Sequence, residues 1–138
     1  MEISDAGGIK MKAEDFDKLV DARLGFCGRT LQIKAAEYAT SDRLHNFKVA
    51  AALQDIEPET ALLGMWAKHI VSVVDIINAI EHHSKVPEPK LLSEKITDVI
   101  NYSLLLEALI EERRAEEELN KKKSFSNLSQ KHHIKCSI

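Results

Sequence analysis

The chain has 138 residues, of which 44% are apolar and 30% are charged, and its formal net charge is −3. This size and composition fit one soluble domain with its own core, and the near-neutral charge with scattered basic residues argues against binding to nucleic acid. Cys27 and Cys136 show neither metal-ligand nor disulfide spacing and the N-terminus lacks the pattern of a secretory signal, so we expect a reduced, cytoplasmic setting.

Apolar residues recur every three or four positions and no segment alternates over the length of a strand, so the sequence predicts an all-α fold. The predicted helices span residues 13–39, 41–53, 58–81 and 93–120. Pro58 suits the first turn of the third helix, and Ser93 suits the cap of the fourth. We expect a single domain over residues 1–120 and a polar, mobile tail over residues 121–138.

The third predicted helix is the most apolar segment of the chain. Its stretch Ala61–Ile80 is long enough to span a bilayer, but Lys68, His69 and Asp75 lie near its centre, where each would cost roughly 2.5 kcal/mol or more. We therefore predict a buried core helix and no membrane span. Because the third and fourth helices are apolar on most of their circumference, we expect a four-helix bundle-like domain that is completed by forming a dimer or tetramer.

Two polar stripes with identical spacing interrupt these two helices. At offsets 0, 4 and 7 stand Lys68, Ser72 and Asp75 in the third helix, and Glu94, Asp98 and Asn101 in the fourth. These offsets place each set on one helix face. A buried charge without a partner costs several kcal/mol, so we expect the stripes to face each other, a ligand or a metal ion. The alternative is a self-neutralising network in which Lys68 pairs with Asp75 or Asp98 and nothing else binds.

The stripes suggest a particular chemistry. Asp75, Glu94 and Asp98 could hold Mg²⁺ or Mn²⁺, because carboxylates on rigid helices suit hard cations. Lys68 suits a phosphate, and the amide of Asn101 suits a base or sugar.

The start of the second helix offers further ligand contacts. Asp42, Arg43 and Asn46 lie where backbone N–H groups and the helix dipole favour an anion. Alternatively, Asp42 caps this helix and Arg43 pairs with a surface acid.

Two segments carry a resemblance to a known family. The stretch Glu94-Lys-Ile-Thr-Asp98-Val-Ile-Asn-Tyr102-Ser-Leu-Leu-Leu resembles the second metal-binding helix of the all-α, MazG-like nucleoside triphosphate pyrophosphohydrolases. The stretches Glu37–Phe47 and Ala67–Asp75 are similar to the small phage and prophage relatives of that superfamily, the nucleotide-modification-associated branch. This likeness implies a nucleotide-binding protein in the host cytoplasm that hydrolyses a nucleoside triphosphate to the monophosphate and pyrophosphate with Mg²⁺.

The resemblance also assigns roles to residues. Together with the stripes it implies a metal set of Asp75, Glu94 and Asp98, with Asp98 and the stripe residue Lys68 as the catalytic pair. The residues that the stripes, the start of the second helix and the resemblance together suggest for nucleotide binding are Asp42, Arg43, Asn46, Phe47, Lys68, Ser72, Asn101 and Tyr102.

The chain departs from the family pattern on both helices. On the fourth, Glu94 stands four residues before Asp98, where the family commonly has three, and Lys95 occupies the three-back position. Where the family has Glu-x-x-Glu, this chain has Ser72-Val-Val-Asp75, with Lys68 one turn earlier, so one carboxylate is missing and a cation is added. Lys68 could then replace the metal as the phosphate contact. Two alternatives to the enzyme follow: a metal-free protein that sequesters a nucleotide signal, for example one used in host defence, and a helical assembly protein.

Overall fold

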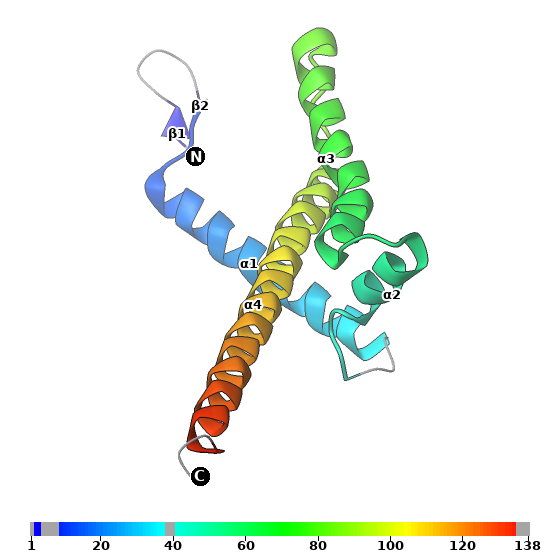
Figure 1. The fold of residues 1–138 in the computed structure, drawn as a ribbon. Coiled ribbons are helices and arrows are strands. Elements are labelled where there is room, and N and C mark those ends of the chain that lie inside the picture. The colour runs from blue at the N-terminus through cyan, green and yellow to red at the C-terminus, as the bar shows by residue number, and fades with distance from the viewer. Residues whose placement is uncertain (1, 4–8, 38–40, 135–138) are drawn as a thin grey trace.

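The structure is a computed structural model that describes the backbone of residues 2–3, 9–37 and 41–134 and the side chains of residues 9–37 and 41–125. Its helices are α1 (Ala13–Glu37), α2 (His45–Gln54), α3 (Pro58–His83) and α4 (Pro89–Ile134) (Figure 1). The all-α prediction is confirmed for these residues. The two-residue strands β1 (Glu2–Ile3) and β2 (Ile9–Lys10), which pair antiparallel, are the exception, and they are too short for a pattern to predict.

Helix α4 is the central element of the fold. It packs against α3 and α1, and α2 packs against α3 (Figure 1). Within the described residues, α1 crosses α4 but makes no helix packing with α2 or α3. A closed bundle would give each helix two neighbours. A single chain therefore forms an open, crossed arrangement in which α1 contacts one helix.

The ends of the helices follow local chemistry. Helix α3 begins at Pro58, whose fixed φ and missing N–H suit the first helical position. Asp55 ends α2 with φ 53°, and Ser84 ends α3 with φ 51°, both in the left-handed region. The N–H group of Ser84 donates to the carbonyl of Ile80 and that of Lys85 to the carbonyl of Ala79, which satisfies acceptors that the last turn would otherwise leave open.

The core lies where α2, the first turns of α3 and the middle of α4 meet. Its buried members are Leu44, Phe47, Leu62 and Leu109, and Leu62 is fully buried. Partly buried side chains surround this cluster: Met65, Trp66, Tyr102, Leu105 and Leu106. Burial of such a side chain contributes about 2 kcal/mol. The cluster therefore holds α2 against the α3–α4 pair and supports the residues described below.

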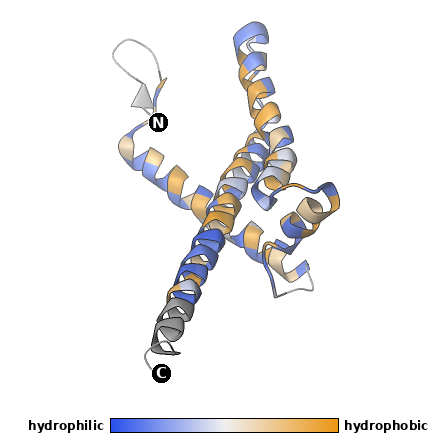
Figure 2. Ribbon diagram, viewed as in Figure 1, coloured by the Kyte–Doolittle hydropathy of each residue, from blue (hydrophilic) through white to orange (hydrophobic). Residues whose placement is uncertain are grey.

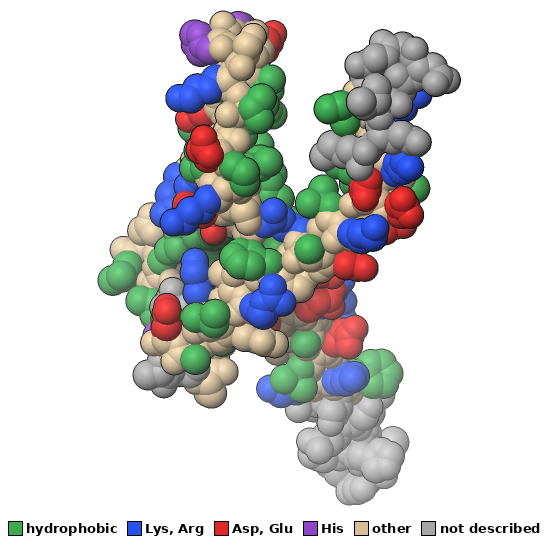
Figure 3. All heavy atoms as spheres, turned by 180° about the vertical axis from the view of Figure 1, so that it is seen from behind, with side chains coloured by type: hydrophobic (Ala, Val, Ile, Leu, Met, Phe, Trp, Pro, Cys, Tyr) green, Lys and Arg blue, Asp and Glu red, His purple; other side chains and the backbone are tan. Residues whose placement is uncertain are grey.

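The prediction that the third helix is buried is wrong for the single chain. Only Ala61 and Leu62 of α3 are buried, whereas Val71 and Ile77 are 56% and 55% exposed. Hydrophobic residues recur along α3 up to its hydrophilic last turn (Figure 2), and their side chains lie on the surface of the arm that ends in the two histidines (Figure 3). By length and composition alone α3 could cross a membrane, and 11% of its most apolar 18-residue stretch is buried in the structure.

The fourth helix is longer than predicted at both ends. It begins at Pro89, so Ser93 lies inside the helix and not at its cap, and it continues to Ile134 where the sequence predicted an end near residue 120. Residues 113–125 are all exposed and mostly polar (Figure 2). This part of α4 is a solvated extension. The predicted mobility of residues 121–138 stays a prediction, and residues 135–138 lie outside the described part.

Candidate functional site

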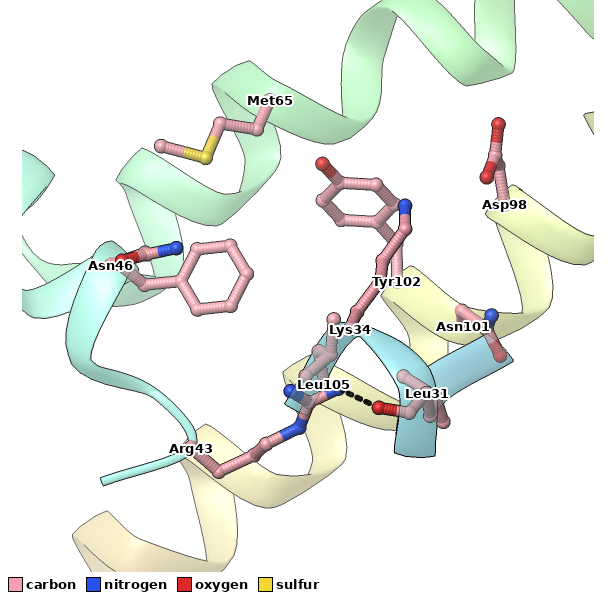
Figure 4. A pocket seen from close by; sticks show the side chains of 10 residues that line it. Leu31, Lys34, Arg43, Asn46, Met65, Asp98, Asn101, Tyr102 and Leu105 are labelled. Carbon is pink, nitrogen blue, oxygen red and sulfur yellow. Dashed lines mark hydrogen bonds between the residues drawn. The ribbon is translucent and has the colours of Figure 1, made fainter. Parts of the chain in front are cut away.

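A cavity of about 110 Å³, here called the inner cavity, is lined by residues from all four helices. Figure 4 shows it between α1, the start of α2, α3 and α4. Its wall consists of Leu31, Lys34, Arg43, Asn46, Phe47, Met65, Asp98, Asn101, Tyr102 and Leu105. Six of the residues predicted from the sequence are among them: Arg43, Asn46, Phe47, Asp98, Asn101 and Tyr102.

Aromatic rings form one wall of the inner cavity. Tyr102 is at their centre, with its ring centroid 6.4 Å from that of Phe47 in an edge-on arrangement and 5.0 Å from that of His69. The Trp66 ring lies nearly parallel to Tyr102 at 6.5 Å. Phe47 is held by the core, so the rings are fixed before any ligand enters. A rigid aromatic wall of this kind suits the flat face of a base.

The amide of Asn101 is the least satisfied polar group of the cavity. Its side chain is 7% exposed, and its Oδ1 atom is buried without a hydrogen-bond partner among the described residues. Such an acceptor costs about 1–3 kcal/mol, which a ligand with an N–H or O–H donor would recover. Asn46 adds a second, exposed amide from the first turn of α2.

Two cations reach the cavity. Arg43 donates a hydrogen bond of 2.7 Å from its Nη2 atom to the carbonyl of Leu31, which ties the start of α2 to the end of α1 (Figure 4). Lys34 extends from α1 across the cavity (Figure 4). No ion pair of Lys34 exists in the described part of the chain. No sequence pattern identifies Lys34, because only the crossing of α1 over α4 brings it to the site.

Asp98 contacts a histidine and not a lysine. Its Oδ2 atom lies 2.9 Å from Nδ1 of His69, which is on α3 one position after Lys68. Burial lowers the pKa of His69, an effect that Asp98 opposes and that Lys68, Lys95 and Lys34 reinforce. The imidazole is therefore neutral at pH 7 and donates its Nδ1 proton to the carboxylate. This pair links α3 to α4 beside the cavity and keeps one carboxylate oxygen engaged.

The rest of the predicted α3 stripe lies away from the inner cavity. Lys68 is exposed and is not part of its wall. Ser72 and Asp75 line a separate cavity of about 300 Å³ between α3 and the start of α4, together with Lys85 and Lys95. The two predicted stripes therefore do not form one site.

The predicted metal ligands are divided in the same way. Glu94 is exposed and pairs with Lys95 at 2.7 Å, which lowers the pKa of Glu94. Asp75 lines the separate cavity of about 300 Å³, and Asp98 contacts His69 beside the inner cavity. No three His, Cys, Asp or Glu side chains within the described ranges are grouped so that they could hold a metal ion.

Asp42 has a structural role at the start of α2. Its Oδ1 atom accepts the backbone N–H of Leu44 at 2.8 Å, and its Oδ2 atom lies 2.9 Å from Nζ of Lys48. Lys48 also reaches Glu112 of α4 at 2.8 Å, and its hydrogen bond lowers the pKa of Asp42. Asp42 therefore anchors α2 to α4 through Lys48, whereas the N-cap of α2 is Leu44 and no described side chain caps it. Arg43 binds a carbonyl and not a surface acid.

Compared with known protein families, curated proteins and solved structures, the chain matches none of them.

Proposed function

We propose that the protein binds a nucleotide, with the base in the inner cavity and without a metal ion in the binding set. One observation carries the proposal: the buried Oδ1 atom of Asn101, which has no partner among the residues that the structure describes, lies beside the fixed rings of Phe47 and Tyr102. A nucleobase has the flat apolar face and the N–H edge that these groups require. The MazG-like resemblance of the motifs at Asn46 and at Asp98–Tyr102 supports the same ligand class.

The donor set does not fit Mg²⁺ as it is arranged. Asp75 lies at a different cavity from Glu94 and Asp98, and Lys95 and His69 already engage Glu94 and Asp98. Mg²⁺ requires near-octahedral oxygen ligands with little tolerance. Binding, as in a protein that sequesters a nucleotide signal, is therefore favoured over hydrolysis to the monophosphate and pyrophosphate.

One experiment tests this function. The purified protein is incubated with nucleoside mono- and triphosphates and cyclic nucleotides, with Mg²⁺ or with EDTA, and both retained ligand and released pyrophosphate are measured. We expect intact ligand to be retained in EDTA, with retention reduced in Asn46→Ala and unchanged in Asn78→Ala, since Asn78 is an exposed α3 residue that lines none of the cavities described here. Pyrophosphate release that requires Mg²⁺ would support the enzyme instead, and no retention by any nucleotide would refute the proposal.

We also propose that the exposed face of α3 is covered by a second copy of the chain in the cytoplasm. Leu63, Ala67, Ile70, Val74 and Ile77 are all exposed and follow a spacing of 4-3-4-3. This is the spacing of a seam between paired helices. In sedimentation experiments we expect a dimer or tetramer that Val74→Glu dissociates, whereas Glu81→Lys at the exposed end of α3 leaves it intact. A monomeric wild-type protein would refute this assembly.

A further inference from the structure

The inner cavity is too small for a whole nucleotide. Its volume is about 110 Å³, whereas sites for small molecules are typically about 300–1,000 Å³. A second cavity of about 510 Å³, here called the outer cavity, shares Lys34 and Asp98 with it. The two cavities therefore adjoin at these side chains. A ligand whose base fills the first can extend into the second.

The wall of the outer cavity comes from one face of α1 and one face of α4. Its α1 residues are Phe26, Thr30 and Lys34, and its α4 residues are Lys90, Ser93, Glu94, Thr97 and Asp98. The α4 residues follow one another at intervals of three, one, three and one, which is one side of a helix. The crossing of α1 over α4 places the two faces together.

Hydroxyl groups of this wall have protons available for a ligand. The Nη1 atom of Arg23 donates to Ser93 Oγ at 2.7 Å and to Thr97 Oγ1 at 3.0 Å. A hydroxyl that accepts a hydrogen bond still has its own proton to donate. Neither hydroxyl donates to another residue in the described part of the chain, although Thr97 is only 2% exposed. Both groups are therefore donors beside a positive charge.

The charges of the outer cavity favour an anion. Arg23, Lys34 and Lys90 have no ion-pair partner among the side chains that the structure describes. Of the two carboxylates of the wall, Glu94 pairs with Lys95 at 2.7 Å, whereas Asp98 accepts a hydrogen bond from the neutral His69 at 2.9 Å and keeps its negative charge. This single charge is outnumbered by the three cations. Uncommitted cations with hydroxyl donors between them are the groups that bind phosphate oxygens.

We infer that the outer cavity is a phosphate site, in which Lys34, Lys90 and the hydroxyls of Ser93 and Thr97 hold the phosphate of the nucleotide. The inference rests on the proposed function, because the base in the inner cavity determines where the phosphate lies. Arg23 orients the two hydroxyls and is a positioning residue. Lys34, at the junction, lies between base and phosphate.

Calorimetric titration in EDTA with the common nucleosides, their 5′-monophosphates and inorganic pyrophosphate tests this inference. We expect a monophosphate to bind at least about tenfold more tightly than its nucleoside, which is the effect of one or two charge-assisted hydrogen bonds. Lys90→Ala and Thr97→Val should each remove about tenfold of the monophosphate affinity and leave nucleoside affinity unchanged. Lys85→Ala, an exposed lysine at a different cavity, is the matched control.

The outcomes separate this inference from the proposed function. If nucleoside and monophosphate bind equally well, or if Lys90→Ala and Thr97→Val behave like Lys85→Ala, the phosphate site is refuted and nucleotide binding stands. If pyrophosphate binds with an affinity that depends on Lys90 while no nucleoside or nucleotide binds, the anion site stands and the proposed function fails. If none of the probes binds, both are refuted.

Discussion

Replacing Asn101 by Leu should make the free protein more stable while removing its ligand binding. The Oδ1 atom of Asn101 is buried without a partner, and the side chain is 7% exposed. An unsatisfied buried acceptor costs about 1–3 kcal/mol, and Leu is apolar and has the same number of side-chain heavy atoms, branched at the same carbon. We therefore expect Asn101→Leu to raise the free energy of unfolding by about 1–2 kcal/mol.

Urea unfolding of the ligand-free protein, followed by far-UV circular dichroism, measures this change. Leu also has a higher helix propensity than Asn, by a few tenths of a kcal/mol. Asn78→Leu at an exposed position of α3 measures this propensity effect alone, and its change in the free energy of unfolding is subtracted from that of Asn101→Leu. A nucleotide at about 100 times its dissociation constant should stabilise the wild type by about 2.7 kcal/mol and should not stabilise Asn101→Leu.

Two results would refute this reasoning. If Asn101→Leu is less stable than the wild type after the Asn78→Leu correction, the amide is already satisfied in the free protein. If nucleotide stabilises Asn101→Leu as much as the wild type, the ligand does not contact Asn101.

Three further predictions follow from the fold. Leu62→Ala should lower the free energy of unfolding by about 3 kcal/mol, because Leu62 is fully buried. Leu63→Ala, at a residue that is 54% exposed, should lower it much less. Equal losses of the two variants in urea unfolding would contradict the core assignment. Because burial lowers the pKa of His69 below its ordinary 6.5, the unfolded chain binds the proton at a higher pH than the folded protein. The free energy of unfolding should therefore fall as the pH decreases through 6.5, and His69→Gln should make this pH dependence shallower. An unchanged pH dependence would show that His69 is not the group responsible. Lys48→Met removes the bridge between Asp42 and Glu112, whose hydrogen bond lowers the pKa of Asp42 below 3.8. The variant should be less stable than the wild type above pH 3.8, and this difference should shrink as the pH falls through the lowered pKa and Asp42 is protonated. Acid unfolding curves of the two proteins that coincide both above and below pH 3.8 would contradict the bridge.

Local sequence signals predicted most of the helical architecture. The apolar period and Pro58 located α1, α2 and α3 within a few residues, because period and proline geometry act within one or two turns. The sequence predicted the start of α4 at Ser93, but the helix begins at Pro89, whose fixed φ also suits a first helical position. A solvated helix lacks the apolar period, so the sequence contains no pattern that predicts the continuation of α4 to Ile134.

The candidate site was harder to predict because it depends on helix rotation and crossing. Asp98, Asn101 and Tyr102 share the α4 face that the stripe identified, and they line the inner cavity together. On α3, a rotation of one residue decides which side chain faces α4, and the structure places His69 against Asp98 while Lys68 is exposed. Lys34 could not be found, because its place depends on a contact between segments far apart in the chain.

The most direct test of nucleotide binding is a ¹⁵N–¹H spectrum of the side-chain amides during titration with a nucleoside monophosphate in EDTA. Asn46 and Asn101 line the inner cavity, so we predict saturable shifts of their side-chain amide signals. The signal of Asn78, which is exposed on α3, should not shift. Unchanged Asn46 and Asn101 signals at saturating nucleotide, or shifts that appear only after Mg²⁺ is added, would contradict a metal-free nucleotide site in this cavity.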